Sequence, residues 1–165
     1  MSYHIYTTRG LVLSSRPQGE ADRVYSILTR DLGLIWASAR AVRKEESKLR
    51  GALEPFSLSQ ISLVKGRERW RATSAEHIRT VTRSIFIAQP LALLERLVQG
   101  EACHTELFDT VELALPAPEL DDDFEIKLVS NILYHLGYLR KEDLTLAKRD
   151  LTQAINEGIR SSGLV

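Results

Sequence analysis

The chain of 165 residues contains one cysteine, Cys103, which excludes an internal disulfide and any zinc site that needs several cysteines. A single cysteine also fits a reducing compartment. No apolar run in the sequence reaches the roughly 18 residues that suggest a membrane span. The amino-terminal residues lack the charged and then apolar order of a signal peptide. The sequence therefore predicts a cytoplasmic protein.

The common signatures of enzymes are also missing. Neither of the common glycine-rich phosphate loops is present, and there is no G-x-S-x-G or H-E-x-x-H motif. Cys103 and His104 are adjacent, whereas a nucleophile and its base are usually distant in sequence. The run Asp121–Asp123 could bind a cation, but a role at the start of a helix explains it with fewer assumptions. We expect no enzymatic activity, no cofactor and no metal.

The balance of 22 basic and 22 acidic residues conceals a strong asymmetry along the chain. Residues 1–83 carry fifteen Lys/Arg and eight Asp/Glu, a net charge of +7, whereas residues 84–165 carry seven and fourteen, a net charge of −7. A split of this size indicates two units with different partners, and it assigns nucleic acid to the first unit.

Five short segments of the first half have the composition and alternation of β-strands. They are residues 4–15, 21–29, 34–41, 56–64 and 69–74. A phase shift near Ser59 indicates a bulge in the fourth segment. In the fifth segment we expect Trp70 in the core and Arg69 and Arg71 on the outside. A long connection after the third strand and a tight hairpin before the fifth describe an OB-fold barrel over residues 1–80.

The third segment, residues 34–41, presents two different faces. One face carries Ile35 and three alanines, which suits the tight interior of a small barrel. The other face carries Trp36 and Arg40, which could stack a base and hold a phosphate. Alternatively, Trp36 packs beneath a neighbouring helix, as large aromatic side chains often do.

The connection Arg40–Phe56 is rich in cations and includes a short helical turn expected at residues 47–53. Its cations are Arg40, Arg43, Lys44, Lys48 and Arg50. A basic loop between strands of a small β-domain is a natural place to meet a phosphate backbone. Glu45 and Glu46 weaken this patch, and the alternative is a loop that is merely solvated.

Apolar residues recur at helical spacing in the second half of the chain, which predicts a small helical domain over residues 81–165. The expected helices begin near Pro90, before Leu107, at Asp121–Asp123 and near Asp150. Gly137 is the expected stop of the third helix. The chain as a whole is therefore predicted to be an α+β protein.

Several segments occur together in an informative order. In the first half they are RGLVL (9–13), GEADR (19–23), LTRDLGL (28–34), SKLRGALEPF (47–56) and KGR (65–67). Over about residues 5–75 their order and spacing resemble the RecO family of bacterial recombination mediators. The helical half resembles that family more loosely, through FEIKL (124–128), LGY (136–138) and AINEGIRSSGL (154–164).

The resemblance implies an OB-fold domain followed by a helical domain, without enzymatic activity. It implies binding to single-stranded and double-stranded DNA, annealing of complementary strands and a location at the bacterial nucleoid. The implied partners are RecR, the acidic tail of single-stranded DNA-binding protein (SSB) and, indirectly, the recombinase RecA. The chain is shorter than typical members and lacks their four-cysteine zinc module, so the resemblance implies a short form without zinc.

The DNA contacts predicted on this basis are basic side chains of the first half and one tryptophan. They are Arg9, Arg23, Trp36, Arg40, Arg43, Lys44, Lys48, Arg50, Lys65, Arg67, Arg69 and Arg71. The cations available to an acidic tail lie between the third and fourth expected helices and are Arg140, Lys141, Lys148 and Arg149. The alternative is a protein adaptor that docks RecR or the SSB tail and binds little DNA itself.

Overall fold

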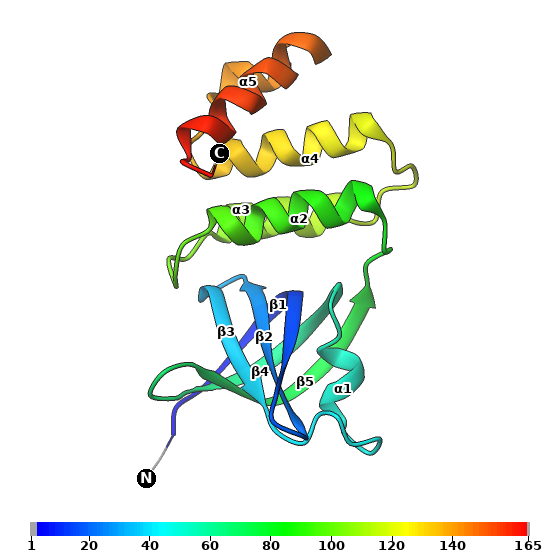
Figure 1. Cartoon of the computed structure of the whole chain (residues 1–165), viewed down its shortest axis with the longest axis vertical. Coiled ribbons are helices and arrows are strands. Elements are labelled where there is room, and N and C mark those ends of the chain that lie inside the picture. Colours follow the sequence, from blue (N-terminus) through cyan, green and yellow to red (C-terminus); the bar gives the residue numbers. More distant parts are fainter. Residues whose placement is uncertain (1–2, 165) are drawn as a thin grey trace. The chain divides into compact units, whose positions relative to one another are not determined.

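The structure is a computed structural model that describes residues 3–164. The chain forms two compact units. The first comprises the residues up to Val81 together with Gly100–Cys103, and the second comprises Thr82–Gln99 and the residues from His104 onward. Figure 1 shows that the strands belong to the first unit and that nearly all of the helices belong to the second.

The strands of the first unit close into a barrel. They are β1 (Ile5–Gln18), β2 (Asp22–Thr29), β3 (Gly33–Ala39), β4 (Ser57–Lys65) and β5 (Trp70–Thr80). Their order around the barrel is β1-β2-β3-β5-β4, and β3 and β5 are parallel whereas the other neighbours are antiparallel. A short helix, α1 (Leu49–Ala52), lies between β3 and β4. This five-stranded barrel confirms the predicted OB-fold.

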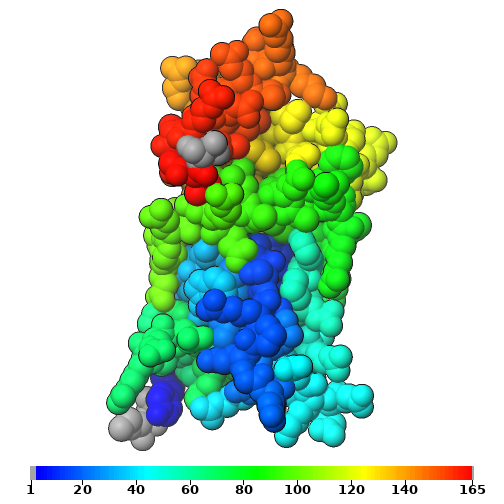
Figure 2. Space-filling view, viewed as in Figure 1, coloured from blue at the N-terminus to red at the C-terminus, as the bar shows by residue number. Residues whose placement is uncertain are grey.

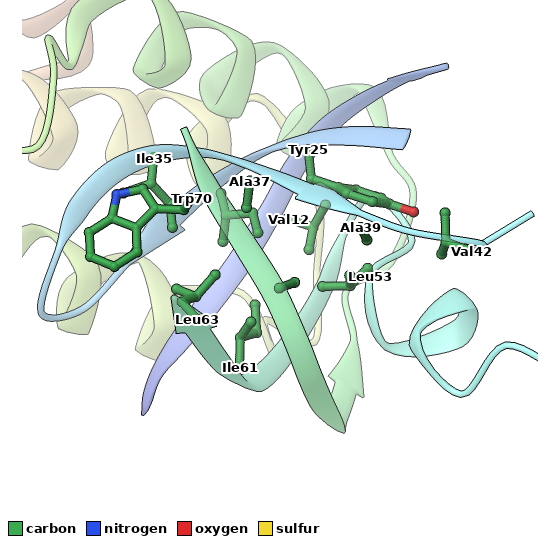
Figure 3. Close-up of a cluster of buried hydrophobic side chains, with 12 residues drawn as sticks. Val12, Tyr25, Ile35, Ala37, Ala39, Val42, Leu53, Ile61, Leu63 and Trp70 are labelled. Carbon is green, nitrogen blue, oxygen red and sulfur yellow. The ribbon is translucent and has the colours of Figure 1, made fainter. Parts of the chain in front are cut away.

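The interior of the barrel is packed tightly around small side chains of β3 (Figure 3). Ala37 and Ala39 are fully buried, which confirms the inner face predicted for these two residues. The strand ends at Ala39, however, and Ala41, which was expected on the same face, lies in a turn with φ of 53°. Trp70 is also buried, as expected from the sequence. Figure 3 shows Trp70 at one end of the cluster, with Val42 and Leu53 near the other end.

The connection between β3 and β4 folds back and contributes to this core. Leu53, directly after α1, is fully buried in the barrel cluster. The Ser59 hydroxyl donates a hydrogen bond to the Ala52 carbonyl at 2.6 Å, and the Phe56 N–H donates to the Val12 carbonyl at 2.8 Å. A helix as short as α1 is not stable alone, so packing of Leu53 and these bonds hold it in place.

The pairing of β5 extends further than the sequence indicated. The expected end was Ser74, but the strand continues to Thr80, which pairs with Ser57 of β4. Most side chains after Ser74 are exposed, so this part of β5 lacks the buried face that produces an alternating pattern. The predicted bulge near Ser59 is confirmed by a shift of register between Leu58 and Ser59.

The second unit is built from α2 (Ile85–Leu97), α3 (Thr105–Ala114), α4 (Asp122–His135), the 3₁₀ helix η1 (Lys141–Thr145) and α5 (Lys148–Ser161). One core cluster is formed by Leu97, Leu133, Leu139, Leu151 and Ile155. Asp121 caps α4 by accepting a hydrogen bond from the Phe124 N–H at 2.8 Å, and Gly137 follows the helix with φ of 85°. No helix within residues 3–164 combines the length and the apolar character needed to cross a membrane.

The start predicted for the first helix of this unit is wrong. α2 begins at Ile85, where the Ser84 hydroxyl accepts a hydrogen bond from the Phe86 N–H, and Pro90 lies inside the helix. Proline removes one backbone donor, which makes it a poor interior residue and a common first residue. The helix tolerates it here because Pro90 is buried together with Leu91 and Leu94.

Replacing Leu53 by alanine tests the part that this residue plays in the barrel. We expect a loss of about 2–5 kcal/mol in the free energy of unfolding, because a fully buried leucine leaves a cavity when it is truncated. Urea denaturation followed by tryptophan fluorescence measures it, since both tryptophans lie in the barrel unit. Ile78→Ala on β5, where the side chain is 48% exposed, is the control and should cost less than about 1 kcal/mol. Equal losses in the two variants would contradict the prediction.

Candidate nucleic-acid interface

Trp36 lies on the outer side of β3. Its side chain is 40% exposed, whereas Ile35 and Ala37 on either side of it are buried. The guanidinium carbon of Arg16, on β1, lies 4.9 Å from the centre of the Trp36 ring, which is the geometry of a cation–π contact. The tryptophan is thus at the surface and not packed beneath a helix, and its neighbour there is a cation.

The strand pairing brings further polar side chains beside Trp36. β3 and β5 pair at Ala37 with Trp70 and at Ser38 with Arg71. Because successive side chains of a strand point to opposite sides, Ser38 and Arg71 share the outer side with Trp36. Arg40 follows directly after β3 and is exposed. We refer to Arg16, Trp36, Ser38, Arg40 and Arg71 as the β3 face.

Arg16 is the member of the β3 face that sequence reasoning missed. It stands opposite Val24 of β2, and Val24 stands opposite Ser38 of β3. Only the register of two strand pairs places Arg16 in the same row as Ser38, and no local pattern carries that information. Arg16 could have been found only from the correct registers of β1 with β2 and of β2 with β3.

The cationic connection, which we call the basic loop (Arg40–Phe56), is anchored to the turn between β1 and β2. The Arg43 N–H donates a hydrogen bond to the Ala21 carbonyl at 3.1 Å, and the Arg43 guanidinium donates to the Gly19 carbonyl at 3.3 Å. The Ala41 N–H donates to the Asp22 carboxylate at 2.8 Å. Figure 2 shows this segment on the surface of the barrel beside the β1–β2 hairpin. The loop therefore has a defined position next to the β1–β2 hairpin, whose first strand carries Arg16.

Most cations of this region are not neutralised. Within the part of the chain that the structure describes, six of them have no carboxylate within ion-pair distance: Arg16, Arg40, Arg43, Lys44, Lys48 and Arg50. All six side chains are exposed. Exposed cations close together raise the local positive potential and attract polyanions. The β3 face thus combines one accessible aromatic ring with exposed cations, and the basic loop, which begins at Arg40 of this face, adds Arg43, Lys44, Lys48 and Arg50.

The other predicted DNA contacts lie elsewhere on the barrel. Arg9 is half-buried on β1, opposite Gln60 of β4. The Arg23 guanidinium donates a hydrogen bond to the Ser15 hydroxyl at 2.8 Å, close to Tyr25, whose pKa is raised by burial. The remaining three are on or next to the β4–β5 hairpin. They are Lys65, Arg67 and Arg69. Lys65 pairs with Glu101, and Arg69 lies 3.8 Å from Glu68. Arg67 is exposed.

Two of the cations predicted for an acidic tail are engaged within the helical unit. Lys148 lies 2.6 Å from the Asp123 carboxylate, and this hydrogen bond raises the pKa of the Lys148 ammonium. Arg140 lies 3.7 Å from the Asp143 carboxylate. The other two, Lys141 and Arg149, are exposed and make no ion pair within the described residues.

A groove of about 480 Å³ lies between α4, η1 and α5, and Lys148 is on its rim. Its apolar lining comes from Ile126, Leu144, Leu146 and Leu151, and its second cation is Lys127. Leu146 is 40% exposed. The groove thus combines exposed apolar surface with two lysines and with the Asp123 carboxylate that pairs with Lys148.

Comparison with known proteins finds a family for the first half of the chain. The family described as "Recombination protein O N terminal" matches residues 1–81, which include all five strands of the barrel. The DNA repair protein RecO of a Synechococcus species (strain JA-2-3B'a(2-13)) is 34% identical over 141 residues, which are 86% of this chain and 48% of that protein. The DNA repair protein RecO of Gloeobacter violaceus is 32% identical over 119 residues, 66% of this chain and 44% of that protein.

Other relatives match over a shorter part of the chain. The DNA repair protein RecO of Dehalococcoides mccartyi (strain 195) is 43% identical over 77 residues, 47% of this chain and 30% of that protein. The chain spans about half the length, or less, of these curated relatives. By this match and by these relatives, residues 1–81 of the chain belong to the RecO N-terminal family, and the chain is similar to DNA repair proteins named RecO over up to 86% of its length.

Proposed function

We propose that the chain is a non-enzymatic DNA-binding mediator of recombination, and that the β3 face and the basic loop form its DNA-binding surface. One observation carries this proposal: Trp36, on the outer side of an OB-fold strand, is exposed and lies among cations without carboxylate partners. Proteins that bind single strands combine an aromatic platform with a cationic groove, because every base has a π-face and every nucleotide a phosphate.

Annealing of complementary strands follows from the same chemistry. Two phosphate backbones repel each other, and the exposed Arg43, Lys44, Lys48 and Arg50 lower that repulsion. Trp36 holds a base by stacking on its flat face. The Watson–Crick edge of the base is not used, so the base stays free to pair. Double-stranded DNA is bound through its backbone alone. In this proposal the chain anneals strands in DNA repair and, with RecR, helps to load RecA.

The contribution of the stacking residue is tested by Trp36→Ala. We expect affinity for a fluorescently labelled oligothymidine to fall about 5- to 150-fold, equivalent to the ~1–3 kcal/mol of one stacked base. Fluorescence anisotropy measures this affinity. Trp36→Phe is the matched control and should retain most of the binding, since phenylalanine also stacks. An unchanged affinity of Trp36→Ala would remove this residue from the interface.

The contribution of the basic loop is tested by changing Arg43, Lys44, Lys48 and Arg50 to alanine together. We expect the slope of log affinity against log salt concentration to become shallower by about 0.7 for each phosphate contact that is lost. The matched control changes Arg140, Lys141, Lys148 and Arg149 to alanine, which alters the net charge by the same amount. Equal effects in the two variants would mean that net charge, and not the loop, governs binding. Unchanged binding in the loop variant would favour a protein adaptor.

Docking of the acidic SSB tail is a second candidate function, and the groove between α4, η1 and α5 favours it. Lys127 and Lys148 on the rim suit the acidic residues of such a tail, and Leu144 and Leu146 suit an apolar end. A peptide carboxylate would replace Asp123 as the partner of Lys148. This pairing is exposed to solvent, so the exchange costs little.

A labelled peptide of the last residues of SSB tests this second function. We expect the double change Lys127→Ala and Lys148→Ala to weaken its binding about tenfold, ~1.4 kcal/mol. Lys141→Ala is the control, because Lys141 does not line the groove. Strand annealing on SSB-coated DNA, with SSB that has or lacks its tail, then separates tail docking from DNA handling. Tail binding that is insensitive to the double change would exclude this groove.

A further inference from the structure

An anion already occupies a site at the end of the barrel where Trp70 lies. The Glu101 carboxylate accepts hydrogen bonds from the Lys65 ammonium, which lies 2.6 and 2.7 Å from its two oxygens, and from the Trp70 indole N–H at 3.0 Å. The Lys65 nitrogen also lies 4.6 Å from the centre of the Trp70 ring. A cation and an N–H donor therefore converge on one negatively charged group.

Glu101 reaches this site from a segment, Gly100–Cys103, that belongs to the barrel unit although it lies between α2 and α3 in sequence. The segment is held against the turn before β3. Gly33 has φ of 73°, and a Cβ atom there would meet the Ala102 carbonyl oxygen at 2.3 Å. The Cys103 thiol donates to the Arg30 carbonyl at 3.4 Å. The close fit at Gly33 keeps the Glu101 carboxylate near Lys65 and Trp70.

The chemistry of the site suits a phosphate as well as a carboxylate. Lysine and an indole N–H are donors without acceptor capacity, so the site requires an anionic or carbonyl oxygen. Hydrogen bonding to Lys65 lowers the pKa of the Glu101 carboxyl, so the resident group is an anion at neutral pH. The side chains of Lys65 and Glu101 are about half exposed, at 51% and 48%, so a competing anion in solution has access to the pair.

Aromatic side chains extend from this site toward the start of β1. The rings of Tyr6 and Trp70 are 5.2 Å apart, and those of His4 and Tyr6 are 4.4 Å apart, both edge to face. Tyr6 is 39% exposed and Tyr3 is 63% exposed. Arg67, on the adjacent hairpin, is exposed as well. A phosphate site with exposed rings beside it is the combination that single-stranded nucleic acid requires.

We propose that Lys65 and Trp70 form a second phosphate-binding site for single-stranded nucleic acid, with Tyr6 and His4 as stacking residues, and that Glu101 occupies this site until a nucleic-acid phosphate displaces it. The inference rests on the proposed DNA-binding function and extends it. Annealing requires two strands to be held at once, and the β3 face offers a single stacking residue, Trp36. Glu101 then sets the strength of the second site, because each phosphate must compete with a carboxylate that is part of the chain.

Replacing Glu101 by glutamine tests this proposal in the intact chain of 165 residues. The amide oxygen of glutamine still accepts the Trp70 N–H, but Lys65 loses its counter-ion. We expect labelled oligothymidine to bind several-fold more tightly, with a salt slope steeper by about 0.7, as for one additional phosphate contact. Glu68→Gln is the matched control, since it makes the same charge change at an exposed side chain of the β4–β5 hairpin, which also carries Lys65. Adding Lys65→Ala to Glu101→Gln should abolish the gain.

A measurement without DNA separates this inference from the proposed function. In the Glu101→Gln variant, titration with inorganic phosphate should shift the NMR signal of the Trp70 indole N–H, and the signal of Trp36 serves as the internal reference. The wild-type chain and the Lys65→Ala double variant should show little shift. If the wild-type chain binds no oligonucleotide, the proposed function fails, whatever phosphate does at Trp70. If Glu101→Gln binds no better than Glu68→Gln, or phosphate leaves the Trp70 signal in place, the second site is overturned.

Discussion

The tight interior of the barrel is the constraint on which the candidate interface depends. Ala37 and Ala39 of β3 are completely buried, in a space that also holds Ile61, Leu63 and Trp70. Larger side chains at these two positions would over-pack the core, which costs about 1–3 kcal/mol. Because the side chains of a strand alternate, small residues inside fix which residues of β3 stand outside. Trp36 is on the surface for this reason, and the cation–π contact with Arg16 follows from it.

The same connection closes the barrel and carries the cations. Leu53 enters the core, while Lys48 and Arg50 on either side of Leu49 remain exposed. Hydrogen bonds from Arg43 to the β1–β2 turn position the rest of the loop. A charged surface loop is usually free to move, but this one is held by hydrophobic burial at one end and by backbone bonds at the other. Its charges therefore keep a defined position on the barrel.

The distribution of ion pairs distinguishes the two ends of the barrel. The basic loop has three glutamates of its own, and within the described residues two of them, Glu45 and Glu46, form no ion pair with its cations. At the other end, Lys65 is held by both oxygens of Glu101. Exposed pairs of this kind contribute little to stability, with a median of about 0–1 kcal/mol. This small contribution agrees with our proposal that the Lys65–Glu101 pair controls access to Lys65.

The sequence by itself determined the type and order of most strands and helices, and which side chains of β3 face the core. The alternation of residues 34–41, the fifth strand around Trp70 and the cap of α4 at Asp121 are local signals, and local periodicity is what a sequence displays directly. The tertiary structure alone decided which distant residues meet. Arg16 reaches Trp36 through two strand registers, and Glu101 reaches Lys65 across 36 positions of the chain. Such contacts depend on how the barrel closes, and barrel closure is a property of all five strands together, which no short stretch of sequence encodes.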